Sequence, residues 1–163
     1  MSPLTERDLR TSMLNVSKGE AGRMYLPRDL ADQPWEHLDY LGWRDPQAPA
    51  KGYLVTVVDD RLRGLALRAP STPPGPRRSM CSICLSQHSG GVSLLVAPRA
   101  GKAGRQGNTL GTYLCSDLRC SLYVRGLLKT EISTVRETLS TEQRVERLVR
   151  NLADFVNRVS ASA

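Results

Sequence analysis

The sequence has few of the residues that build large hydrophobic cores and lacks the long apolar runs that cross membranes. It contains one Phe and two Trp among 163 residues, so we expect a small core. No apolar run reaches the roughly 18 residues of a membrane-spanning helix. The N-terminal residues also lack the apolar segment of a signal peptide. These absences predict a cytoplasmic protein without a membrane partner.

Candidate catalytic groups are equally scarce. The chain has two histidines, His37 and His88, and no sequence motif assigns a nucleophile or a carboxylate partner to either. Asp117 is the only acidic residue between positions 61 and 129. We therefore expect that the protein is not an enzyme. An enzyme that uses its basic segment to bind an anionic substrate is the weakest alternative.

The cysteines occur as two close pairs that are separated by thirty residues. In a cytoplasmic chain, pairs at this spacing indicate metal binding rather than disulfides. The first pair precedes a predicted β-hairpin, and the second lies where a strand passes into a helix. This is the order of ligands in a treble-clef zinc finger. We therefore predict one structural Zn²⁺ in a closed tetrahedral site, with the ligands Cys81, Cys84, Cys115 and Cys120.

A redox-active Cys-x-x-Cys motif is the competing hypothesis for the first pair. Such a motif lies between a strand and a helix. Here a proline-rich connector over residues 69–78 precedes the pair, and a glycine-containing loop over residues 87–91 follows it. His88 lies four residues after Cys84 and is a candidate replacement ligand. Because four cysteines already complete the site, we favour the four-thiolate zinc centre.

The overall pattern predicts an α+β fold: β-hairpins with a treble-clef zinc finger, short N-terminal helices and a C-terminal amphipathic helix. Ser140 begins the C-terminal helix with a capping box, and apolar residues recur at helical spacing from 145 to 159. We expect two parts. A helical and turn segment over residues 1–50 packs on the sheet, and an α/β treble-clef zinc-binding domain covers residues 51–163.

Local propensity predicts the shorter elements. Thr5 and Ser17 are capping residues for two short helices, and a helical turn follows Pro34. Strands are predicted by β-branched and alternating residues over 53–58, 62–67, 92–97 and 109–114. Turns or loops are expected over 41–46, 87–91 and 98–108. Ser116 is expected to cap the helix that contains Cys120.

Charge is unevenly distributed along the chain. Residues 1–60 carry a net −3, residues 61–129 a net +10, and residues 130–163 no net charge. A local excess of this size favours an anionic partner, such as a nucleic acid or an acidic protein surface. Ordinary solubilising charge is the alternative. The basic excess belongs to the part of the chain that carries the cysteines.

The loop over residues 98–108 is rich in glycine and basic residues. It is not a nucleotide-binding P-loop, because the Gly-x-x-x-x-Gly-Lys-Ser/Thr pattern is absent and a strand follows. It is either a flexible hairpin tip with solubilising charges or a mobile loop that contacts phosphate or an acidic surface. The candidate partner-binding residues are Arg99, Lys102 and Arg105 of the loop, with Leu122 and Arg125 on the outward face of the following helix.

Six stretches of the sequence resemble the short actinobacterial members of the FBP family, which are described as elongation factor G-binding. The resemblance spans nearly the whole chain, and the stretches around the cysteines are specific. The matching stretches are 17–21 (SKGEA), 26–30 (LPRDL), 41–46 (LGWRDP), 78–84 (RSMCSIC), 97–104 (APRAGKAG) and 115–126 (CSDLRCSLYVRG).

This resemblance implies a treble-clef zinc finger whose four ligands are the four cysteines. The family is related to the FusB and FusC fusidic acid resistance proteins. It therefore implies a protein that binds elongation factor G through its zinc domain and modulates release of the factor from the ribosome, with fusidic acid protection as a further expectation. The first fifty residues do not predict the N-terminal four-helix bundle of the resistance proteins. An RNA- or DNA-binding zinc module that contacts phosphates through the basic loop is the alternative.

Overall fold

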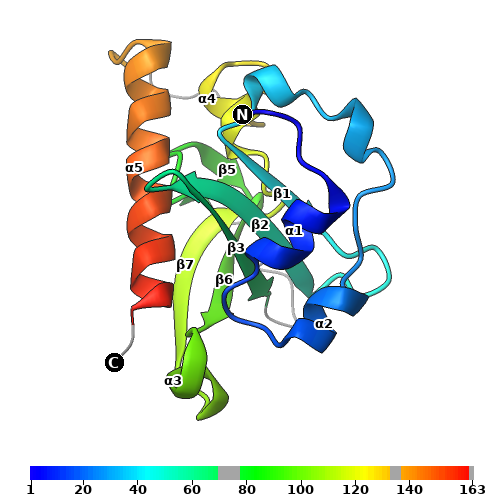
Figure 1. Cartoon of the computed structure of the whole chain (residues 1–163). Helices are drawn as coiled ribbons and strands as arrows, with labels where there is room; N and C mark the ends of the chain where they lie inside the picture. The colour runs from blue at the N-terminus through cyan, green and yellow to red at the C-terminus, as the bar shows by residue number, and fades with distance from the viewer. Residues whose placement is uncertain (70–77, 133–136, 162–163) are drawn as a thin grey trace.

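A five-stranded antiparallel sheet forms the centre of the protein, with helices on both faces (Figure 1). The computed structural model describes residues 1–69, 78–132 and 137–161. The strands lie in the order β1-β2-β3-β6-β7, and their bounds are Tyr40–Arg44, Lys51–Val58, Arg61–Arg68, Val92–Pro98 and Thr109–Cys115. Strands β4 (Arg78–Met80) and β5 (Gln87–Ser89) form a separate two-stranded sheet.

The helices are short except for the last. Their bounds are Glu6–Ser12 (α1), Lys18–Arg23 (α2), Gly101–Arg105 (α3), Cys120–Val124 (α4) and Thr141–Ser160 (α5). Two 3₁₀ turns cover Leu30–Asp32 and Trp35–His37. Figure 1 shows α5 on one side of the sheet and α1 with α2 on the other. The predicted α+β fold is confirmed. The division of the chain at residue 50 stays a prediction.

Capping boxes begin three of these helices. The side chains of Thr5, Ser17 and Ser140 each accept a hydrogen bond from the backbone N–H three residues later. In return, the side chain of that later residue accepts from the backbone N–H of the capping residue. Each reciprocal pair satisfies N–H groups that have no partner within the helix. The predicted starts of the N-terminal helices and of the C-terminal helix are therefore confirmed.

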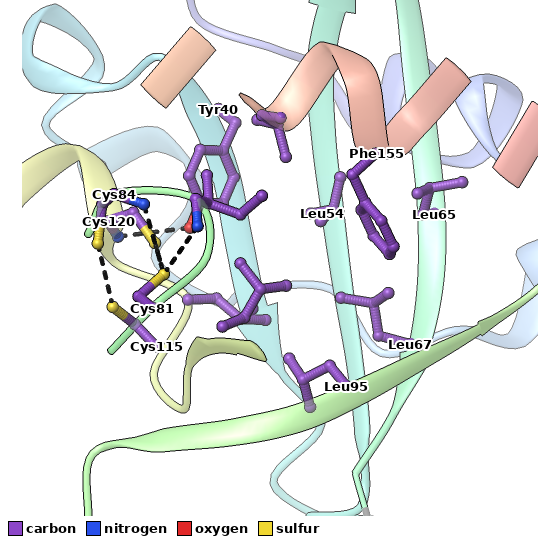
Figure 2. Close-up of a cluster of buried hydrophobic side chains, with 14 of the residues drawn as sticks. Tyr40, Leu54, Leu65, Leu67, Cys81, Cys84, Leu95, Cys115, Cys120 and Phe155 are labelled. Carbon is purple, nitrogen blue, oxygen red and sulfur yellow. Dashed lines mark hydrogen bonds between the residues drawn. The ribbon is translucent and has the colours of Figure 1, made fainter. Parts of the chain in front are cut away.

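Two apolar clusters cover the two faces of the sheet. The larger one joins α5 to the sheet through residues such as Leu54, Leu95 and Phe155, and it also contains all four cysteines (Figure 2). The smaller one packs the N-terminal segment on the opposite face and includes Trp35 and Trp43. The predicted zinc ligands are thus part of the main core, because they belong to the cluster of side chains that α5 covers.

The central sheet is nearly interrupted between β3 and β6. These strands pair only at Arg68 and Val96, and the side chain of Asn15 crosses the gap. Its amide group donates to the carbonyl oxygens of Ala66 (2.9 Å) and Pro98 (3.0 Å). Its oxygen accepts from the backbone N–H of Ala66 at 2.8 Å. Asn15 therefore supplies hydrogen bonds that a continuous ladder would otherwise provide.

Three segments that were predicted as turns or loops contain regular structure. Residues 41–46 include most of β1, whose alternating side chains are buried once it pairs with β2. Residues 87–91 include β5, which pairs with β4. Residues 98–108 include α3. These short elements depend on distant partners or on glycine geometry, so local propensity did not identify them.

The described residues contain no helix that is both long and apolar enough to cross a bilayer.

The start of α4 also differs from the prediction. The helix begins at Cys120 rather than directly after Ser116, and no side chain caps its backbone N–H groups. The Ser116 hydroxyl instead pairs with the Ser93 hydroxyl at 2.7 Å. Gly126, with φ at +70°, follows the end of α4, as its sequence position suggested. Residues 70–77 of the predicted connector over 69–78 lie outside the described part of the chain, and its last residue, Arg78, begins β4 instead of remaining outside a sheet.

Candidate metal centre

The four cysteine sulfurs lie together and are buried. All four Sγ atoms are within 4.8 Å of one another. The Sγ–Sγ distances are 3.7 Å for Cys81 and Cys120 and 3.5 Å for Cys84 and Cys115, and none of these cysteines forms a disulfide. Ligands about 2.3 Å from a tetrahedral Zn²⁺ lie about 3.8 Å apart. The donor type, number and spacing therefore fit one structural zinc, as predicted.

A tight turn after β4 positions the first pair. The backbone N–H of Leu85 donates to the carbonyl oxygen of Cys81 at 3.0 Å, which closes the turn. The N–H groups of Ile83 and Cys84 point toward the Cys81 sulfur, at 3.4 Å and 3.5 Å. Leu85 adopts a positive φ of 60°, a conformation that is costly for a side chain of this type. The turn thus presents both thiolates on one side and directs backbone donors toward one of them.

The second pair comes from the junction of β7 and α4. Cys115 ends β7 and Cys120 begins α4. Between them, Leu118 is buried with φ at +58°, and its N–H donates to the Cys115 carbonyl oxygen at 2.9 Å. The Tyr40 hydroxyl of β1 accepts from the Cys120 N–H at 3.4 Å. The sheet therefore holds the second pair through both β7 and β1.

Burial makes the cluster dependent on a cation. Hydrogen bonding to the Cys115 and Cys81 thiols, with burial, raises the pKa of Cys120 well above its ordinary value. Burial also raises the pKa of Tyr40, and the neighbouring Cys120 adds to this effect. Four thiolates at this site require compensating positive charge, which Zn²⁺ supplies when it binds. Four protein ligands fill the tetrahedron, so the metal is structural.

His88 lies directly beside the metal centre. It is 6% exposed, and its Nε2 atom is 3.4 Å from the Cys115 sulfur. Its ring meets the ring of Tyr123 edge-on, with 4.8 Å between centroids. From its position in the sequence, His88 was a candidate replacement ligand. With four sulfurs already clustered, the structure places it as a hydrogen-bonding neighbour of one ligand.

The glycine-rich segment forms a short helix with an anchored base. The Arg99 guanidinium donates to the carbonyl oxygen of Arg158 at 3.1 Å, at the end of α5. A Cβ atom on Gly104 would lie 1.8 Å from the carbonyl oxygen of Arg99, so only glycine fits there. Lys102 and Arg105 are exposed on α3. Of the three predicted contact residues in this segment, Arg99 thus anchors it, while the other two face solvent.

Leu122 and Arg125 lie elsewhere and are engaged within the protein. Leu122 is half-buried against the N-terminal cluster, so the expectation that it is exposed is wrong. The Arg125 guanidinium forms two hydrogen bonds with the Asp39 carboxylate, at 2.6 Å and 2.8 Å. Figure 1 shows α4 and α3 at opposite ends of the molecule. The five predicted contact residues therefore do not form one surface.

An exposed apolar pair on the sheet was not predicted. Leu94 of β6 and Tyr113 of β7 are cross-strand partners, with exposed fractions of 38% and 53%. Both lie on the face of the sheet that α1 and α2 cover over β3. Leu94 shares its face of β6 with Val96, which pairs with Arg68. Arg68 in turn shares its face of β3 with Ala66, which packs against the N-terminal cluster. Strand alternation contains this signal, since the neighbouring Leu95 and Leu114 are the buried residues.

Comparison with known proteins identifies the family. A sequence model described as "FBP C-terminal treble-clef zinc-finger" matches residues 8–159. No curated protein sequence matches the chain. The structure of the fusidic acid resistance protein FusC aligns with a TM-score of 0.47 and 22% identity. That alignment covers 61% of this chain and 45% of FusC, so the chain spans less than half of that protein. From the match over residues 8–159, the chain belongs to the FBP C-terminal treble-clef zinc-finger family.

Proposed function

We propose that this protein is a non-enzymatic translation-associated protein that binds elongation factor G through its zinc-finger domain and promotes release of the factor from the ribosome. The proposed partner is the one that the sequence resemblance to the FBP family implies. The structural observation that supports it is the exposed side of the β6–β7 hairpin, which carries an apolar pair on its strands and basic residues on α3 at its turn. We call it the tip surface and define it by Leu94, Lys102, Arg105 and Tyr113.

The tip surface has the composition of a protein-binding site. Residues 92–116 contain three basic residues and no acidic ones. Leu94 and Tyr113 provide exposed apolar area beside each other, and Lys102 and Arg105 are exposed at the end of the same hairpin. Protein interfaces typically pair an apolar centre with a polar rim, and Tyr is common at their centres. A protein with an acidic surface around an apolar patch would complement this arrangement.

A nucleic-acid partner is the second candidate, because the same basic residues would contact phosphates and Tyr113 would stack on a base. The two candidates differ in their salt dependence. Nucleic-acid affinity falls steeply with salt through counterion release. Binding that depends on an apolar centre falls less. A pull-down from lysate at low and moderate salt, with and without nuclease, separates them: elongation factor G retained after nuclease supports the proposal, and recovery of nucleic acid alone favours the second candidate.

Direct titration of purified elongation factor G tests the surface. We expect Tyr113→Ala and the double variant Lys102→Glu/Arg105→Glu each to weaken binding by about tenfold or more, as is typical of interface hot spots. The matched control is Arg7→Glu/Lys18→Glu, which reverses two exposed charges on α1 and α2. If elongation factor G bound the tip variants as tightly as it binds the wild type, this surface would be excluded as its binding site.

The effect on release needs a functional assay. Ribosomes that hold elongation factor G in the presence of fusidic acid are mixed with the protein, and the bound factor is measured after pelleting. We expect the wild-type protein to accelerate loss of the factor and the Tyr113→Ala variant to do so more slowly. Binding without any change in release would leave the partner supported and refute the release function.

A further inference from the structure

The zinc centre places a large negative charge in the core. Four thiolates and one Zn²⁺ carry a formal net charge of −2, and the four cysteines are at most 2% exposed. A buried charge of this kind needs hydrogen-bond donors. The Cys81 sulfur has two backbone N–H groups of its own turn within 3.5 Å. The Cys115 sulfur has the His88 ring nitrogen at 3.4 Å.

The surroundings of His88 fix the direction of its ring. Strand β5 carries His88 opposite Ser79 of β4. On one side, the Tyr123 ring meets it edge-on, and the Tyr123 hydroxyl donates to Asp117 at 2.8 Å. On another side, Gly91 leaves space for the ring, because a Cβ atom there would lie 2.6 Å from His88 Nδ1. The ring is therefore enclosed with Nε2 directed at the sulfur.

We propose that His88 is a positioning residue of the zinc centre, which donates its Nε2–H to the Cys115 thiolate. The hydrogen bond withdraws electron density from this sulfur, so the bound thiolate is less nucleophilic and is retained on the metal. Partners of metal ligands commonly change metal affinity by 10–100-fold. The His88 side chain thus donates a hydrogen bond to the Cys115 thiolate, as backbone N–H groups do to the Cys81 thiolate. One ligand of each pair is therefore stabilised by a different kind of donor.

Site-resolved alkylation of the zinc-loaded protein tests this assignment. Iodoacetamide modification of each cysteine is followed by mass spectrometry in the wild type, His88→Leu and His88→Gln. We expect His88→Leu to raise the Cys115 rate about tenfold relative to the Cys81 rate. His88→Gln keeps an N–H donor of similar reach and should restore most of the protection. Tyr123→Phe keeps the ring contact and is the matched control for disturbance of the pocket.

The ratio of the two rates separates a hydrogen bond from general loosening. A purely structural loss would raise all four cysteine rates together, so an unchanged ratio of Cys115 to Cys81 would overturn the proposal. The wild-type protein provides a test without any variant: ¹⁵N NMR of the zinc-loaded form should show His88 as the Nε2–H tautomer. A neutral ring protonated on Nδ1, or a Co²⁺-substituted spectrum with three sulfur ligands and one nitrogen, would each refute it.

Discussion

At the scale of single residues, side chains complete hydrogen bonding that the backbone leaves open. Asn15 joins β3 to Pro98 of β6, where the backbones of these two strands no longer pair. The capping boxes do the same at helix starts. Such positions are visible in sequence only when a motif accompanies them. The box at Ser17 is a motif and was predicted, whereas the partners of Asn15 lie 51 and 83 residues away and were not.

Replacing Asn15 tests how much the strand junction depends on it. We expect Asn15→Ala to lower the free energy of unfolding by about 2 kcal/mol, because partly buried backbone groups of Ala66 and Pro98 lose their partners. Chemical denaturation measures the change. Asn157→Ala alters an exposed residue of α5 and serves as control; an equally small effect of both substitutions would contradict the role of Asn15.

The capping box of α2 gives the stability a defined pH dependence. Hydrogen bonds from the backbone N–H and the hydroxyl of Ser17 lower the pKa of Glu20 below its ordinary value. The folded pKa is below the unfolded one, so this contribution to stability is present above the unfolded pKa. It is lost as pH falls through the folded pKa.

An NMR titration of the Glu20 carboxyl group should therefore report a pKa below that of a free glutamate. Ser17→Ala should raise the pKa of Glu20, while Ser140→Ala, which removes the equivalent cap of α5, should leave it unchanged. Because Ser17→Ala keeps the backbone N–H, a Glu20 pKa that does not respond to it would show that the Ser17 hydroxyl does not stabilise the charged form.

At the scale of elements, close contact between β1 and the turn between Cys115 and Cys120 connects the N-terminal segment to the metal centre. A Cβ atom on Gly42 would lie 2.7 Å from both the Cβ and the carbonyl oxygen of Leu118. Leu118 in turn lies between the ligands Cys115 and Cys120. The glycine therefore allows a strand of the sheet to approach the turn that holds the second pair.

Substitution of Gly42 should consequently affect both stability and metal binding. We expect Gly42→Ala to lower the free energy of unfolding by about 2 kcal/mol through steric overlap, and to weaken zinc retention against a chelator. Gly22→Ala in α2 meets no atom within 4 Å and should be neutral or stabilising by up to about 1 kcal/mol. Thermal unfolding and zinc competition measure the two effects. If Gly42→Ala retained zinc as well as the wild type does, the contact with β1 would not contribute to metal binding.

Short elements were harder to predict than long ones for a physical reason. The 20-residue α5 carries its own apolar face and its own cap, so its sequence specifies it. Strands β4 and β5 have three residues each and become regular only by pairing with each other. Helix α3 contains two glycines, which disfavour a helix intrinsically; its base is held by contacts with the end of α5.

At the scale of the whole molecule, the zinc centre and the hydrophobic core are one unit. The four cysteines belong to the same buried cluster as Leu54, Leu95 and Phe155 (Figure 2). Binding of Zn²⁺ to a site absent from the unfolded chain contributes directly to folding free energy. For a domain with a net stability of about 5–15 kcal/mol, loss of this contribution is large.

Removal of zinc should therefore unfold the protein as a whole. We expect a strong chelator, or the substitution Cys84→Ser, to abolish the cooperative thermal transition of the folded chain. Circular dichroism and calorimetry monitor the loss, and added Zn²⁺ should restore the transition of the wild type but not that of the variant. An unchanged melting temperature after verified metal removal would show that the sheet and α5 fold without the metal.

The sequence by itself determined the zinc ligands, the main hairpins, the capped helices and the family, because each depends on neighbouring residues or on a fixed spacing. Only the tertiary structure decided which side chains are free to bind a partner. Lys102 and Arg105 are exposed, whereas Arg99 caps α5 and Arg125 pairs with Asp39. Exposure and pairing depend on residues distant in the sequence, so charge alone did not distinguish these arginines. The position of His88 beside Cys115 was likewise decided by tertiary structure, because it follows from the pairing of β4 with β5.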